Sequence, residues 1–152
     1  MRSLELQGPV ESWPVVELGG RRWRVAPVYV APVCRRDVEG ICDAWGCEIP
    51  SAALVDAIWR AADVKLDPWR FARPPAHNSP EDHRRRVVLE IGSEPFALLA
   101  GSHKDFARMP DGRVDLYGWH TKSGDPIEKG RTSHNDTYCD YSQGIRPVQE
   151  IL

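Results

Sequence analysis

Hydrophobic and polar residues alternate in the first third of the chain, which predicts extended strands. The runs 15–18 and 21–25 flank a pair of glycines, and glycine tolerates the positive φ that a tight hairpin turn requires. In the second run, Trp23 and Val25 fall on one face of the strand, with arginines on the other. The stretch 32–48 that follows is expected to be an irregular loop.

A helical period replaces this alternation after residue 50. Ser51 is a natural N-cap, because its hydroxyl can accept a hydrogen bond from an otherwise unpaired backbone N–H. The helix is expected to end before Pro68, because the residue before a proline avoids the helical region. Ser79 predicts the start of a second helix. Apolar residues at helical spacing predict one buried stripe on the first helix: Leu54, Val55, Ile58, Trp59 and Ala62.

Strand patterns return in the last third, in the apolar run 96–100 and in the alternating run 113–117. The predicted fold class is therefore α+β, a small and mostly antiparallel sheet with about two helices. The length of 152 residues predicts a single domain over 1–152. One core is expected to contain residues from the hairpin, the helix and the apolar run: Trp23, Leu54, Ile58, Trp59 and Leu98.

Composition narrows the classes of function. Lys and Arg total 20 against 22 Asp and Glu, and this balance argues against nucleic acid as a partner, which needs clustered positive charge. No window has the ~20 apolar residues needed to span a membrane, so no membrane insertion is expected. The beginning of the chain does not read as a signal peptide. The expected location is the cytoplasm, unless the protein is released to the cell wall or packaged in a virion.

The cysteines do not indicate a function by themselves. They stand at Cys34, Cys42, Cys47 and Cys139, with no CxxC pair and no common zinc-finger spacing. Free, partly buried thiols are the expectation for a protein that stays in the cytosol. A disulfide within the stretch 32–48 is the alternative, if the protein acts outside a reducing compartment.

Side chains suited to chemistry concentrate between residues 101 and 146. His120, His134 and Asp140 could provide the three protein ligands of a catalytic zinc ion with one open position. Alternatively, Asp140 could orient a histidine that acts as a general base. Neither arrangement is specific on spacing alone, because isolated histidines are more often partly exposed surface residues.

Five further residues in this region are candidates for supporting roles. Lys104 and Tyr141 are the expected catalytic neighbours of the histidines, whereas Trp119, Arg146 and Ser142 are expected to bind substrate. Surface ion pairs and ordinary structural roles are the alternatives for these residue types. No P-loop, dinucleotide fingerprint or GxSxG motif is present.

The same region resembles a family of small, largely uncharacterised bacterial proteins, many of which carry signal peptides. The motifs that match are Ala-Gly with Lys-Asp in 100–105, Tyr-Gly-Trp-His in 117–120, a histidine at His134, and Asp-Tyr-Ser-x-Gly-Ile-Arg in 140–146. The likeness extends upstream through 49–63. Histidines of that family are replaced here by Ser102 and Gln143, which puts any mechanism that needs them in doubt.

The resemblance implies action outside the cytoplasm, and cell-wall cleavage fits that implication. The expected function is therefore an endolysin-like peptidoglycan hydrolase of phage or bacterial origin, which cleaves an amide bond with a His/His/Asp site. The alternative is a structural or binding module such as a virion component, because Trp, Tyr and Arg also favour interfaces. A nuclease built on His134 is disfavoured, because the basic track that it needs is missing.

Overall fold

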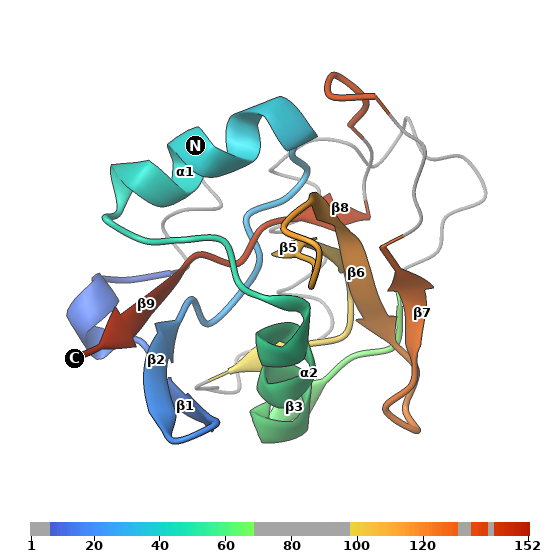
Figure 1. The fold of residues 1–152 in the computed structure, drawn as a ribbon. Helices are drawn as coiled ribbons and strands as arrows, with labels where there is room; N and C mark the ends of the chain where they lie inside the picture. Colours follow the sequence, from blue (N-terminus) through green and yellow to red (C-terminus); the bar gives the residue numbers. More distant parts are fainter. Residues whose placement is uncertain (1–6, 69–97, 131–134, 140–141) are drawn as a thin grey trace.

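Two small sheets on either side of one helix form the framework of the structure, a computed structural model that describes residues 7–68, 98–130, 135–139 and 142–152 (Figure 1). The helices are α1 (Val38–Ala44) and α2 (Ala52–Ala61). The strands are β1 (Val15–Leu18), β2 (Arg21–Val25), β3 (Val64–Lys65), β4 (Leu99–Ala100), β5 (Lys104–Arg108), β6 (Val114–His120), β7 (Pro126–Lys129), β8 (Gln143–Gly144) and β9 (Val148–Ile151).

The strand pairing confirms the predicted α+β class with mostly antiparallel sheets. The predicted hairpin forms β1 and β2, in which Val16 lies opposite Trp23, and β9 pairs with the free edge of β2. The second sheet has the order β7-β6-β5-β8, and its β5–β8 pair is parallel. A further parallel pair joins β3 to β4. β9 therefore joins the first hairpin from far along the chain.

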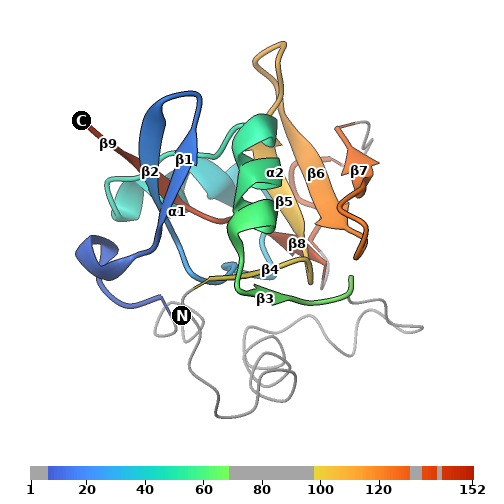
Figure 2. The same ribbon diagram turned by 90° about the horizontal axis from the view of Figure 1, so that it is seen from below.

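Helix α2 lies between the two larger sheets, with β1 and β2 on one side and β5 and β6 on the other (Figure 2). It begins where Ser51 predicts, since the Ser51 hydroxyl accepts a hydrogen bond of 3.1 Å from the Leu54 backbone N–H. Its apolar stripe is buried against the hairpin. The predicted core is confirmed, because one cluster contains Trp23, Leu54, Ile58 and Leu98, with Trp59 packed against it.

Replacement of Ile58 by alanine is expected to reduce the free energy of unfolding by about 2–5 kcal/mol. The Ile58 side chain is only 2% exposed and touches both the hairpin and the 98–100 segment through its cluster, so its loss leaves a cavity. Urea unfolding followed by circular dichroism measures the loss. Val15→Ala, on the exposed face of β1, is the control and should change little. Equal behaviour of the two variants would contradict the packing of α2 on the hairpin.

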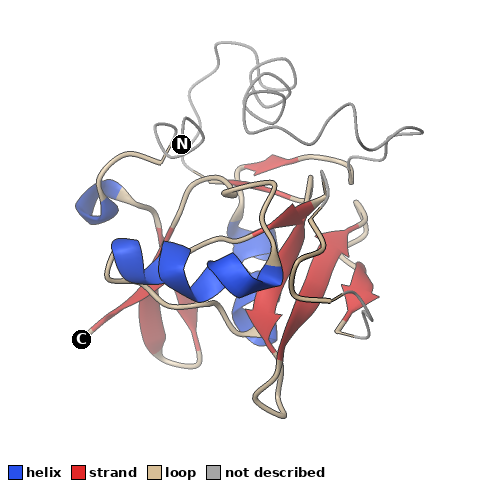
Figure 3. Ribbon diagram, turned by 90° about the horizontal axis from the view of Figure 1, so that it is seen from above, coloured by secondary structure: helices blue, strands red, loops and turns tan. Residues whose placement is uncertain are grey.

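The expectation of an irregular loop over 32–48 is wrong for residues 38–44, which form α1. Val38, Ile41, Cys42 and Trp45 recur at helical spacing, and all four belong to or pack against a second cluster around Phe106. In Figure 3, this helical segment lies to the side of the four-stranded sheet, with one end next to its strands. The helical period was therefore present in the sequence, although it is short and interrupted by Gly40.

Three further expectations concern the cysteines, the segment after residue 78 and membrane-spanning helices. All four cysteine thiols are free, as expected for a protein without disulfides. The predicted helix from Ser79 lies outside the described residues, as does the beginning of the run 96–100. Neither helix in the described part of the chain has the length and apolar character needed to cross a membrane.

Candidate active site

A kink near the end of β6 shapes the candidate site. Gly118 and Trp119 both adopt positive φ, 96° and 57°, which is unusual for a bulky residue such as tryptophan. In a regular strand, residues three apart point to opposite faces of the sheet. Here Tyr117 and His120 instead both reach Asp56 on α2, because the backbone turns between them.

Asp56 binds one side chain with each of its carboxylate oxygens. Its Oδ1 lies 2.7 Å from His120 Nε2, and its Oδ2 accepts a hydrogen bond of 2.9 Å from the Tyr117 hydroxyl. The Asp56 side chain is 31% exposed, whereas that of His120 is only 3% exposed. The pair therefore lies at the edge of the interior, where one partner still meets solvent.

Two aromatic rings contact the His120 ring, in addition to the contact of Asp56 with Nε2. Trp59 stacks on it with ring centroids 5.5 Å apart and planes 20° apart, and Tyr117 meets it edge-on at 6.3 Å. Because an ionised carboxylate only accepts hydrogen bonds, Nε2 carries the proton that Asp56 binds. At the other ring nitrogen, Nδ1, the structure shows no hydrogen bond from a described residue. A neutral His120 thus presents a lone pair at Nδ1.

Tyr117 keeps its proton throughout the physiological range. Burial and the hydrogen bond to Asp56 raise the pKa of Tyr117 to about 12. The phenol therefore acts as a permanent donor that fixes the Asp56 carboxylate, and through it the orientation of His120.

A second carboxyl, Asp105 on β5, lies on the buried side of the kink. It is 2% exposed and stands directly opposite Tyr117 in the strand register. Its Oδ2 atom and the Cε1 atom of His120 both lie within 3.5 Å of the point where a Cβ on Gly118 would sit. The Cγ1 atom of Val55 lies closer still to that point, at 3.2 Å, so a side chain at position 118 would crowd this region.

Polar groups surround the buried carboxyl of Asp105. Tyr29 hydrogen-bonds its carboxyl, and the guanidinium of Arg146 lies nearby, 4.3 Å above the Tyr29 ring. Burial outweighs these two favourable contacts and raises the pKa of Asp105 to about 7. Burial likewise raises the pKa of Tyr29 to about 12. Asp105 is thus the carboxyl here that changes charge near neutral pH.

The residues predicted to bind substrate are all buried, and their described contacts are with the protein itself. Arg146 donates hydrogen bonds of 2.5 Å to the carbonyl oxygens of Ala26 and Leu99. Trp119 donates from Nε1 to the Ser102 carbonyl at 3.0 Å. Ser142 is 1% exposed. Their contact with substrate stays a prediction, and Arg146 has a structural function in the interior.

Lys104, predicted to be catalytic, lies on the other face of β5 from Asp105. Its ammonium group is 4.6 Å from the centre of the Trp119 ring and 3.5 Å from the carboxylate of Glu128. Its backbone N–H donates to the Ser142 carbonyl at 2.7 Å. The kink therefore separates Lys104 and Trp119 from the Asp56–His120 pair.

The predicted zinc centre is not tested by the structure. Of its three ligands, His120 is described, whereas His134 and Asp140 lie outside the described residues, together with the catalytic candidate Tyr141. Within the described part of the chain, no group of three or more His, Cys, Asp or Glu side chains could hold a metal ion. The metal centre stays a prediction.

The sequence reasoning missed the two aspartates that face His120. Asp56 is half-buried beside the apolar stripe of α2, and a carboxylate next to such a stripe was the available signal. Ser102 and Gln143, which stand where the resembled proteins have histidines, are both buried. Ser102 bonds His103 Nδ1 at 2.7 Å in the interior, and the Gln143 amide nitrogen reaches the carbonyl oxygens of Tyr138 and Val33.

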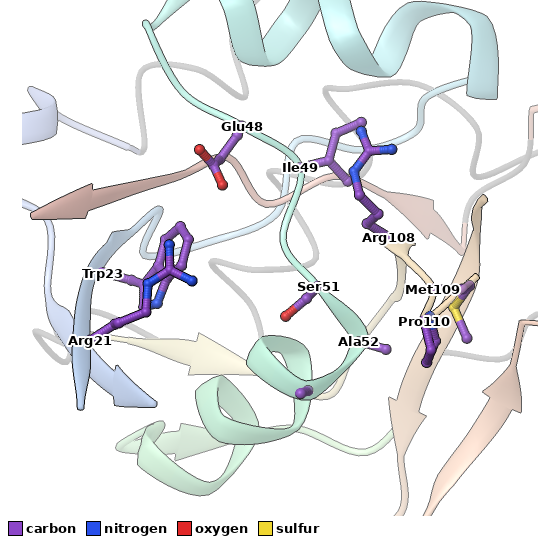
Figure 4. A pocket seen from close by; sticks show the side chains of 10 residues that line it. Arg21, Trp23, Glu48, Ile49, Ser51, Ala52, Arg108, Met109 and Pro110 are labelled. Carbon is purple, nitrogen blue, oxygen red and sulfur yellow. The ribbon is translucent and has the colours of Figure 1, made fainter. Parts of the chain in front are cut away.

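A pocket of about 500 Å³ opens near the beginning of α2 (Figure 4). Ala52 lines it, and this residue is one helical turn from Asp56 on the same face of α2. The lining of the pocket combines one aromatic and several apolar side chains with charged ones. Its walls are formed by Arg21, Trp23, Glu48, Ile49, Ser51, Ala52, Ala53, Arg108, Met109 and Pro110.

Comparison of the chain with protein-family models, with curated proteins and with solved structures found no match. The resemblance to small, often secreted bacterial proteins therefore rests on the sequence motifs alone.

Proposed function

We propose that the chain is a hydrolase in which His120, oriented by Asp56, activates water. The observation that carries this proposal is the 2.7 Å contact between Asp56 Oδ1 and His120 Nε2. An imidazole fixed by a carboxylate at one nitrogen is suited to accept a proton at the other.

The proposed substrate is an amide bond in the peptide part of peptidoglycan. Water attacks the amide carbonyl carbon while His120 Nδ1 takes a proton from it. The bond between carbon and nitrogen then breaks, and the same proton leaves with the amine, so that a carboxylic acid and an amine are formed. The choice of cell wall follows from the resemblance to often secreted bacterial proteins, and the protein would act as an endolysin or a virion component does.

A binding module is the second candidate, and the pocket near α2 favours it. Trp23, Arg21 and Arg108 line that pocket, and Trp and Arg are enriched at the centres of protein interfaces. In that case the Asp56–His120 pair would stabilise the fold rather than perform chemistry. A hydrolase would release new amino groups from purified cell walls, whereas a binding module would be retained on the walls without cleaving them.

The deciding experiment incubates the protein with purified peptidoglycan and measures both the loss of turbidity and the release of new amino groups. Asp56→Asn is expected to reduce kcat by about 10²-fold or more, because His120 loses the charged group that fixes its tautomer. Asp111→Asn, in the exposed turn between β5 and β6, is the matched control and should keep full activity.

Metal content is measured on the same samples. One zinc ion per chain would support the predicted metal centre, in which His134 and Asp140 are ligands. Wild-type protein that releases no amino groups from any wall, with or without added zinc, would contradict the hydrolase. Retention of the protein on those walls would then establish the binding module.

A further inference from the structure

The C-terminal end of α1 brings two cysteines together. The backbone N–H of Cys47 donates to the Cys42 carbonyl at 2.9 Å. The N–H of Gly46 donates to the Asp43 carbonyl, also at 2.9 Å, and Gly46 has the positive φ of 64° that this type of helix end, the Schellman motif, favours. In many such motifs the side chains at the two ends of the longer hydrogen-bonded loop contact each other. Here both of those side chains are cysteines.

The backbone holds the two cysteines at a separation that a disulfide can span. The covalent bonds on either side of the 2.9 Å hydrogen bond keep the Cα atoms of Cys42 and Cys47 within about 6.8 Å of each other. Disulfides usually join Cα atoms that are about 4.4–6.8 Å apart. Both side chains are buried in the same apolar cluster around Phe106, so they lie on the same side of the turn.

The surroundings of the two thiols suit a structural bond better than a catalytic one. Burial raises the pKa of Cys42 to about 12, and the neighbouring Cys47 thiol contributes to this rise. Burial likewise raises the pKa of Cys47 to about 11, and its Sγ lies 3.5 Å from the Trp45 carbonyl oxygen. Catalytic disulfides are easily reduced because their thiolates are stabilised. Because no such stabilisation exists here, a bond between these two sulfurs would resist reduction.

We propose that Cys42 and Cys47 form a disulfide that closes the end of α1 when the protein folds in an oxidising compartment. A donor disulfide such as oxidised glutathione accepts two electrons from the pair: the bond between the two Sγ atoms forms, the donor bond breaks, and the two protons leave with the donor as two thiols. In a reducing cytosol both cysteines stay free, as they are in the structure. The pair does not depend on the proposed hydrolase.

The test refolds the full chain from urea in a buffer of reduced and oxidised glutathione and counts the thiols by rapid alkylation. The wild type is expected to lose two of its four thiols. Trypsin releases residues 37–60 as one peptide that contains both cysteines, and this peptide should be unalkylated and lighter by the two thiol hydrogens. Cys34→Ala is the matched control and should still form the bond. Cys42→Ala should leave every remaining thiol free.

The same redox buffer with urea distinguishes a bond that the fold favours from one that any short segment could form. Because the native backbone already holds the two cysteines together, the equilibrium constant for oxidation should be about tenfold or more larger in the folded wild type than in urea. Equal constants, four free thiols after refolding, or a bond to Cys34 or Cys139 would each overturn the proposal. No readout uses activity, so the result is independent of the peptidoglycan assay.

Discussion

His120→Gln is expected to reduce the rate of peptidoglycan hydrolysis by about 10²- to 10⁴-fold, the range usual for loss of a general base. The glutamine amide can still donate to Asp56, in place of Nε2, so the Asp56–Tyr117 contact survives. It has no basic nitrogen to take the place of Nδ1, so water is no longer activated. Initial rates of amine release at saturating substrate measure the loss.

Stability must be followed in the same variant, because His120 is an interior residue stacked on Trp59 rather than a surface histidine. Tyr117→Phe provides a graded comparison, since it keeps the ring and removes only the hydrogen bond to Asp56. Its activity should fall less than that of His120→Gln. A folded His120→Gln variant with wild-type activity would remove His120 from the mechanism.

Arg146→Met is expected to lower the free energy of unfolding by about 3–5 kcal/mol, the cost of breaking a buried charged network by removal of one partner. The arginine is 1% exposed and binds two backbone carbonyl oxygens, one at the end of the first hairpin and one on β4. Methionine fills a similar volume, so the loss reports on the missing hydrogen bonds and on the positive charge removed from near Asp105.

Urea titrations of both proteins give this difference. Arg22→Met, on the exposed face of β2, is the control and should leave the unfolding midpoint close to that of the wild type. A loss under about 1 kcal/mol, the net value of a single ordinary hydrogen bond, would mean that Arg146 is not essential to the interior. The substrate-binding function predicted from the sequence would then regain support.

Local patterns were sufficient to predict much of the fold. The hairpin of β1 and β2 and the helix α2 depend on turn glycines, an N-cap and periodicity, all of which act over a few residues. Helix α1 was missed because its seven residues present only two turns of periodicity. The apolar faces that form the core were predictable. Their division into two clusters, one around α1 and one around α2, was not predictable from the sequence.

The candidate site was predictable only in part, for a physical reason. His120 follows a recognisable strand, but its partner Asp56 lies 64 residues earlier in the sequence. No local propensity encodes such a pair, which forms only when α2 packs on β6. Asp105 adds a second difficulty, because a buried carboxylate contradicts the usual preference of aspartate for the surface. Tyr29 and Arg146, which lie near its carboxyl, are far from it in the sequence.

The late position of β9 affects how the protein folds as it is synthesised. Strand β2 has no partner on its free edge until residues 148–151 have left the ribosome. The Val30–Ile145 bridge and the Arg146 hydrogen bonds also form only when the end of the chain has been synthesised. Until then the nascent chain exposes an unpaired strand edge together with the apolar face of Trp23 and Val25. Such an intermediate folds slowly and aggregates readily, so we expect its yield in cells to depend on chaperones.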